Sequence, residues 1–161
     1  MAQLPVLTYP DPRLTTPCAA VTDFTGAVGE LADNLLDTLY ATTGIALSAP
    51  QVGDLSRVLV MDLSPDHSAP AVYVNPEILA RRKPGLVEES CLSVPGVVGN
   101  VIRHTQLRVR AQDVHGEPFE RDLEGMHAVG LQHELDHLDG RLFIERLSWF
   151  RRLRLKLAGA A

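Results

Sequence analysis

Cysteine is scarce in this chain of 161 residues, which contains only Cys18 and Cys91. Two cysteines are too few for a fold held together by disulfides, and they favour a reducing compartment. We therefore expect a cytoplasmic protein. The first residues, MAQLPVLTYPDPRL, lack a basic region followed by an apolar stretch, and we expect no secretory signal. No apolar run approaches the roughly 20 residues of a membrane-spanning helix. We therefore expect no membrane partner.

The overall composition is ordinary for a globular protein. Apolar residues make up 45% of the chain and charged residues 22%, and a chain of this length can bury a core without disulfides or metals. There is no internal repeat and no linker long enough to divide the sequence. Residues 1–161 are therefore expected to form one domain.

Strand patterns occupy the middle of the chain. Segments rich in β-branched residues and bounded by Pro, Gly or Asp predict strands at 57–63, 71–79, 97–104 and 106–114. His115-Gly116 is then expected to turn the chain into one more strand.

Helical patterns lie on either side of these strands. Residues 25–42 place four apolar side chains on one helical stripe: Val28, Leu31, Leu35 and Leu39. Residues 125–140 predict a central helix that ends at Gly140, and a C-terminal helix is predicted from Leu147, Phe150, Leu153 and Leu157. This order predicts an α+β fold with antiparallel or mixed sheets around the central helix.

The central helix carries an H-E-x-x-H motif, His133-Glu134-Leu135-Asp136-His137. Histidines four residues apart on a helix can hold a divalent metal, with the glutamate between them as general base. The same side chains could instead lie on a solvated helix face. The surrounding Val, Leu, Ala and Gly residues indicate a buried helix, in which histidines and acids need partners such as a metal.

A catalytic site of this kind requires a third protein ligand, which the downstream sequence does not supply. Phe143 stands where one class of zinc proteases has a third histidine, and no acid follows Glu145. Upstream, Cys91 offers a thiolate, a good ligand for zinc or ferrous iron. Cys91 precedes Pro95-Gly96, which we expect to form the turn that presents its sulfur.

Three segments, in order, resemble the motifs of the peptide deformylase family. They are GIALSAPQ (44–51), ESCLS (89–93) and QHELDHL (132–138), beside the family patterns G-x-G-L-A-A-P-Q, E-G-C-L-S and Q-H-E-x-D-H-L. Alone, the first segment favours a tight loop with a surface glutamine, whereas the ordered set is highly specific. The resemblance covers essentially the whole chain and implies a single catalytic domain over residues 1–161.

The resemblance implies a role for each matching residue. Glu134 matches the general acid/base, and the Gln51 side chain and the Leu92 backbone N–H match the groups that hold the developing oxyanion. Asp136 is expected to orient the coordinating histidines. One divalent metal, usually ferrous iron in the family, with zinc or nickel as alternatives, would be held by Cys91, His133 and His137.

The resemblance also implies the reaction and the substrate. The family hydrolyses the N-formyl group from the N-terminal methionine of new peptides and releases formate, with the peptide extended along a strand edge. The apolar members of the substrate site are equally consistent with core positions. By position, the site should involve Gly44, Ile45, Ala46, Val87, Ser90, Met126 and Val129.

The chain departs from the family motifs at three positions. Ala46 and Ser90 replace glycines, and Ser48 replaces an alanine. Since Ser90 lies where the peptide backbone should pass, we expect an active enzyme with an altered pocket mouth. Arg103 matches a family arginine that pairs with the glutamate of the second motif, here Glu89.

The end of the chain is basic, although the net charge of the whole chain is −5. Its apolar stripe could pack on the body and leave the charges solvated, or the charges could approach RNA phosphates. Some family members dock on the ribosome through a C-terminal helix. A ribosome contact is therefore a candidate partner, whereas sequence-specific nucleic-acid binding is not expected. The basic residues are Arg146, Arg151, Arg152, Arg154 and Lys156.

Two other functions stay open. One is a related hydrolase that removes formyl or acyl groups from a different substrate. The other is an inactive paralogue with a structural metal. Structural zinc sites close all four positions with protein ligands, whereas this chain offers three, together with Glu134 and Gln51, which such a site does not need.

Overall fold

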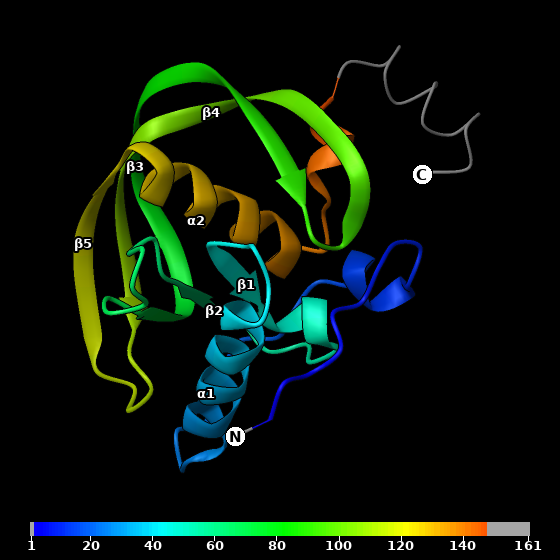
Figure 1. Ribbon diagram of the computed structural model, residues 1–161. Coiled ribbons are helices and arrows are strands. Elements are labelled where there is room, and N and C mark those ends of the chain that lie inside the picture. Colours follow the sequence, from blue (N-terminus) through cyan, green and yellow to red (C-terminus); the bar gives the residue numbers. More distant parts are fainter. Residues whose placement is uncertain (1, 148–161) are drawn as a thin grey trace.

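The computed structural model describes residues 2–147 and has an α+β fold (Figure 1). Its sheet is antiparallel throughout, in the order β1-β2-β3-β4-β5. The predicted C-terminal helix, apart from Leu147, lies outside the described residues. No described helix has the length and apolar character needed to cross a membrane. The elements are α1 (Ala27–Tyr40), β1 (Ala46–Ser48), β2 (Val58–Met61), β3 (Ala71–Cys91), β4 (Val94–Gln112), β5 (Pro118–Glu124), α2 (Gly125–Leu138) and the 3-10 turns η1 (Pro12–Thr15), η2 (Ala49–Val52) and η3 (Phe143–Arg146).

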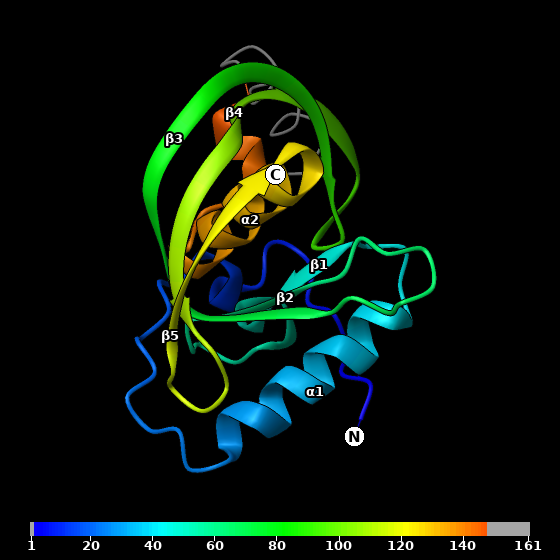
Figure 2. The same ribbon diagram turned by 90° about the vertical axis from the view of Figure 1, so that its left-hand side faces the viewer.

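The two helices cover opposite faces of the sheet at β2 (Figure 2). Successive strand side chains point to opposite faces, so Leu59 and Met61 join the core around α2, and Val58 and Val60 join the core around α1. This double burial explains the uninterrupted apolar run of β2. Each fully buried aliphatic side chain contributes about 2 kcal/mol.

The predicted stripe of α1 faces this second core. Val28, Leu35 and Leu39 are buried, and Leu31 packs against them while partly buried. The prediction of an amphipathic helix over this segment is confirmed.

β3 and β4 form one long antiparallel ribbon that continues past the sheet and arches over α2 (Figures 1 and 2). The predicted strands at 97–104 and 106–114 are confirmed as strand up to Gln112, and both belong to the single strand β4, which pairs with β3 or β5 along nearly its whole length. The strand predicted at 71–79 is longer than expected, because β3 continues from Ala71 to Cys91. Register shifts along this pairing are the kind of irregularity that bends a ribbon.

α2 lies between the sheet and the arch of the ribbon. Ten of its residues are buried, from Ala128 to Leu138 with the exception of His133, which confirms the predicted burial of the motif helix. The helix ends at Leu138, and Gly140 follows with φ of 70°, a conformation that glycine adopts without strain.

The segment 44–53 is not a surface loop. It forms β1 at the edge of the sheet and then η2, and Gln51 is only 2% exposed. The Gln51 side chain turns back to accept the backbone N–H of Ser48, at 2.9 Å. This local hydrogen bond holds the amide inside the protein.

Candidate metal centre

Cys91, His133 and His137 come together at one end of the ribbon, and their ligand atoms all lie within 4.8 Å of one another. The histidines are one helical turn apart on α2, and Cys91 ends β3. The turn that presents its sulfur is Leu92-Ser93, since Cys91 pairs with Val94. The prediction that Pro95-Gly96 forms this turn was wrong, because these residues lie inside β4.

The donor set fits a divalent metal. The distance from Cys91 Sγ to His137 Nε2 is 3.2 Å, and ligands around a tetrahedral metal lie about 3.5 Å apart. Burial, with the nearby charges of His133 and Arg103, lowers the pKa of His137 well below its ordinary value. His137 is therefore neutral and retains a lone pair for a metal.

The tautomer of His133 follows from its contact with Glu89. Burial raises the pKa of Glu89, but hydrogen bonds from His133 and Arg103 outweigh it and lower the pKa to about 2. Glu89 is thus ionised and only accepts hydrogen bonds, so His133 Nδ1 donates to Glu89 Oε2, at 2.9 Å. Burial lowers the pKa of His133, but hydrogen bonds to Cys91 and Glu89 outweigh it and raise the pKa well above its ordinary value. A metal would therefore take the place of the proton on Nε2.

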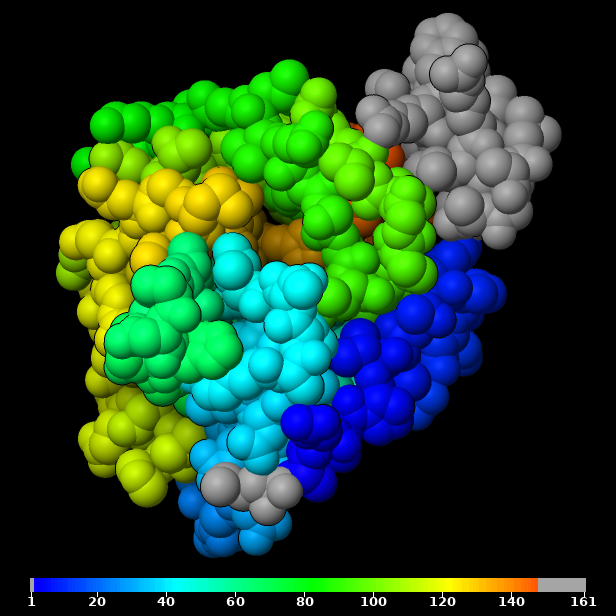
Figure 3. All heavy atoms as spheres, in the orientation of Figure 1, coloured from blue at the N-terminus to red at the C-terminus, as the bar shows by residue number. Residues whose placement is uncertain are grey.

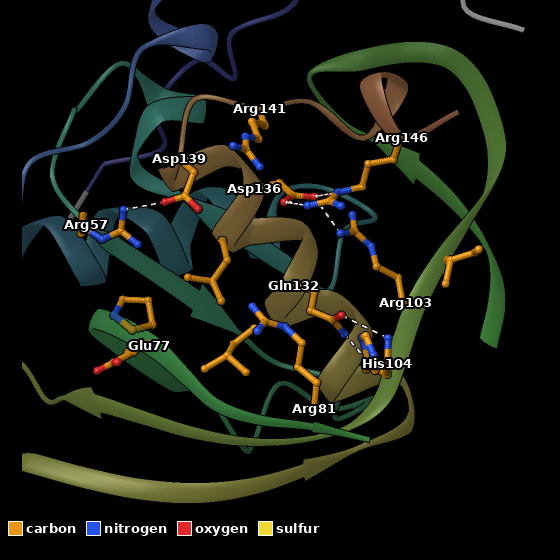
Figure 4. A pocket seen from close by; sticks show the side chains of 14 residues that line it. Arg57, Glu77, Arg81, Arg103, His104, Gln132, Asp136, Asp139, Arg141 and Arg146 are labelled. Carbon is orange, nitrogen blue, oxygen red and sulfur yellow. Dashed lines mark hydrogen bonds and ion pairs between the residues drawn. The ribbon is translucent and has the colours of Figure 1, made fainter. Parts of the chain in front are cut away.

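A buried ion-pair network supports this histidine. Arg103 donates to both oxygens of Glu89, at 2.6 and 3.0 Å, and to Asp136 at 2.7 Å. The predicted pairing of Arg103 with Glu89 is confirmed. Asp136 accepts from Arg103 and Arg146 and contacts neither histidine, so the carboxylate that orients a ligand is Glu89. Figure 4 shows Arg103, Asp136 and Arg146 at the wall of a separate cavity of about 530 Å³ on another face of α2.

Glu134 is buried beside the cluster, with 3% of its surface exposed. Burial raises its pKa, as suits a group that accepts and then returns a proton near neutral pH. Its Oε2 accepts the hydroxyl of Ser48, at 2.7 Å. The sequence did not predict this contact, because the two residues are far apart along the chain; the S-x-x-Q spacing of 48–51 could have indicated only the bond between Ser48 and Gln51.

The Gln51 amide group faces the same cluster. Its Nε2 donates to Ser93 Oγ at 3.2 Å and lies 3.9 Å from Cys91 Sγ. Its Oε1 is held by the backbone N–H of Ser48. The amide is therefore oriented with its hydrogens toward the proposed metal position.

A cavity of about 440 Å³ opens onto the cluster. In Figure 3 the surface is hollowed where the ribbon, the segment around β1 and the start of α2 meet, and later residues of α2 form the floor. Of the residues expected at the substrate, Gly44, Ile45, Ala46, Ser90, Met126 and Val129 line this cavity, as do Gln51, Cys91, Leu92, His133 and Glu134. Sequence reasoning missed Thr43, Glu88, Glu89, Pro95, Gly96 and Gly130.

Val87 is the predicted substrate residue that does not line the cavity. It shares a strand face with Glu89 and Cys91, but it is four residues from Cys91, or about 13 Å along an extended strand. There it pairs with Val101 under the ribbon. Val87 is therefore part of the ribbon and not of the cavity wall.

Three protein donors that could hold a metal, a buried glutamate beside them and an open cavity are the features expected of a metal-dependent hydrolase of the H-E-x-x-H class. The model of the polypeptide deformylase family matches residues 3–152. The chain belongs to this family.

Individual relatives are similar to this chain over nearly its whole length. The peptide deformylase of Alkalilimnicola ehrlichii is 46% identical over 97% of this chain and 88% of its own, and that of Pseudomonas aeruginosa is 45% identical over 97% and 94%. The crystal structure of a peptide deformylase from Legionella pneumophila has a TM-score of 0.92 at 38% identity, covering 97% of this chain and 92% of that one. The enzyme from Ehrlichia chaffeensis, in complex with actinonin, has a TM-score of 0.90 at 31% identity, covering 98% and 96%.

Proposed function

We propose that this protein hydrolyses the N-formyl group from the N-terminal methionine of newly synthesised peptides and releases formate. The observation that carries the proposal is the placement of Glu134 and Gln51 beside a Cys/His/His cluster in one cavity. Membership of the peptide deformylase family supports this activity. The comparisons give no support to a hydrolase with a shifted substrate or to an inactive paralogue.

The metal of this proposal is one ferrous ion per chain, held by Cys91, His133 and His137, with zinc or nickel as substitutes in purified protein. A divalent metal in such a site supplies Lewis acidity, which lowers the pKa of a water toward neutrality and polarises a carbonyl. One thiolate and two neutral imidazoles are ligands for both iron and zinc. The metal content of protein purified without oxygen or added metal would decide between them.

The side chains of the chain perform the proton transfers and hold the charge. Glu134 takes a proton from the water as its oxygen attacks the formyl carbon, and then gives a proton to the departing amine. The Nε2–H of Gln51 and the backbone N–H of Leu92, in the turn after β3, donate to the developing oxyanion. Losing one such donor typically costs about 100- to 1,000-fold in rate.

The shape and lining of the cavity support an extended peptide as the substrate. β1 is the edge strand of the sheet and its neighbours Gly44 and Ile45 line the cavity, so an extended peptide can add along this edge. The formyl-methionine side chain would contact Ile45, Met126 and Val129. Ser90, which is exposed at the mouth, would contact the peptide backbone.

The cellular setting is part of the same proposal. New peptides carry formyl-methionine where they are synthesised, so we place the enzyme in the cytoplasm. The basic residues after Arg146, namely Arg151, Arg152, Arg154 and Lys156, support a contact with ribosomal RNA phosphates. Co-sedimentation with ribosomes that survives removal of residues 147–161 would count against this contact.

Anaerobic turnover of formyl-Met-Ala by iron-loaded protein tests the activity. We expect formate release by the unaltered protein, loss of release in Glu134→Ala with metal retained, and no change in Glu117→Ala, which alters an exposed glutamate in the β4–β5 turn. No release by metal-loaded protein would reject the proposal. Release of acetate from acetyl-Met-Ala in place of formate would identify the alternative acyl hydrolase.

A further inference from the structure

The hydroxyl of Ser48 lies between the two groups to which the proposed function assigns the chemistry. Ser48 is fully buried. Its Oγ is 2.7 Å from Glu134 Oε2 and 3.0 Å from Gln51 Oε1. The hydroxyl therefore links the proposed general base to the proposed oxyanion donor.

A hydroxyl has one hydrogen to donate. The Gln51 Oε1 and an ionised Glu134 are both acceptors, so the hydroxyl can satisfy only one of them at a time. A hydrogen bond to a charged oxygen is shorter and stronger than one to a neutral oxygen. The hydrogen accordingly goes to Glu134, in agreement with the shorter of the two distances.

We propose that Ser48 is a positioning residue that couples Glu134 to Gln51. Its hydroxyl holds one carboxylate oxygen of Glu134 and leaves the other, Oε1, for the proton transfer at the cavity that Glu134 lines. Because the backbone N–H of Ser48 also donates to Gln51 Oε1, at 2.9 Å, one residue orients both side chains. This inference rests on the proposed function of the site.

The coupling acts during the hydrolytic step. Glu134 Oε2, the Ser48 hydroxyl and the Gln51 Oε1 form one chain of contacts, at 2.7 and 3.0 Å. Hydrogen bonds in a chain polarise one another, so the Nε2–H of Gln51 becomes a stronger donor as the oxyanion forms.

The variants Ser48→Ala and Ser48→Cys separate this role from packing. Alanine removes the hydroxyl and keeps the backbone N–H bond to Gln51, and it is the residue of the family motif at this position. Cysteine keeps a similar volume but is a weak donor. Because a misplaced catalytic group can cost about 100-fold in rate, we expect kcat to fall about 10- to 100-fold in both variants. The KM for formyl-Met-Ala and the metal content should stay near those of the unaltered protein, and both variants should remain folded.

A double-mutant cycle with Gln51→Ala tests the coupling itself. We expect Ser48→Ala to reduce kcat less in the Gln51→Ala background than alone, because part of its effect passes through the amide. Fully multiplicative effects would overturn the coupling, as would an unchanged kcat in Ser48→Ala. Loss of folding in both Ser48 variants would show a structural role and overturn the inference too. A failure of the proposed function is distinguishable, since the unaltered protein would then release no formate.

Discussion

Replacing Arg103 with methionine should destabilise the protein strongly. The guanidinium lies between two buried carboxylates, those of Glu89 and Asp136, and is itself only 2% exposed. Breaking a buried pair by removing one partner typically costs about 3–5 kcal/mol, because the remaining charge is buried without compensation. Hydrogen bonds from His133 and from Arg103 together lower the pKa of Glu89 from 4.5 to about 2, so Arg103 supplies part of the stabilisation of this buried charge.

Urea unfolding followed by circular dichroism would measure this loss. A cost of about 3–5 kcal/mol is a large part of the roughly 5–15 kcal/mol that stabilises a domain. Arg110→Met is the matched control on the same strand. Arg110 pairs with Glu120 at 3.0 Å but is 54% exposed, so its replacement should cost less than about 1 kcal/mol.

The same change should also weaken the metal site. Without Arg103, Glu89 is no longer held against His133, and loss of such a supporting contact typically lowers metal affinity about 10- to 100-fold. Chelator competition at equilibrium would measure it. Equal unfolding free energies in Arg103→Met and Arg110→Met would refute this reasoning, whereas partial recovery in the double variant Glu89→Leu/Arg103→Met would support it, because that variant buries one unpaired charge fewer.

Three further outcomes follow from the structure. Because the pKa of Glu89 is lowered by folding, its stabilisation is complete above about pH 4.5 and is lost as the pH falls toward 2; unfolding free energies across this range should fall less steeply in Glu89→Gln. Gly140→Ala should cost about 1–3 kcal/mol more than Gly96→Ala. Both glycines have positive φ, but a Cβ at Gly140 would lie 2.9 Å from backbone atoms of residues 15–17; equal melting temperatures would contradict this. Cys91→Ser should lower metal content well below one ion per chain by elemental analysis, and full occupancy would remove Cys91 from the ligand set.

Features that depend on neighbours in the chain could be predicted from the sequence. The apolar period of α1, the burial of the motif helix and the turn before β5 follow from local spacing and composition. The H-E-x-x-H motif places both histidines on one side of α2 for the same reason. The ordered motifs then indicated Cys91 as the third ligand, which the structure brings to the histidines.

Features that depend on distant partners were decided only by the tertiary structure. Residues 80–90 are mostly polar and carry no strong strand pattern, yet they form strand because β4 supplies their hydrogen bonds. Val87 has the apolar side chain of a pocket residue but does not line the cavity, although its neighbour Glu88 does. The segment 44–51 suggested that Gln51 lies at the surface. That prediction was wrong, because the fold buries Gln51.

The chemistry of the site divides in the same way. Which residue types could hold a metal and move a proton was determined by the sequence, because ligand and base are properties of side chains. Which carboxylate orients His133, and which hydroxyl contacts Glu134, was decided by folding. Ser48 and Glu134 are 86 residues apart along the chain, and only the packing of β1 against α2 brings them within hydrogen-bond distance.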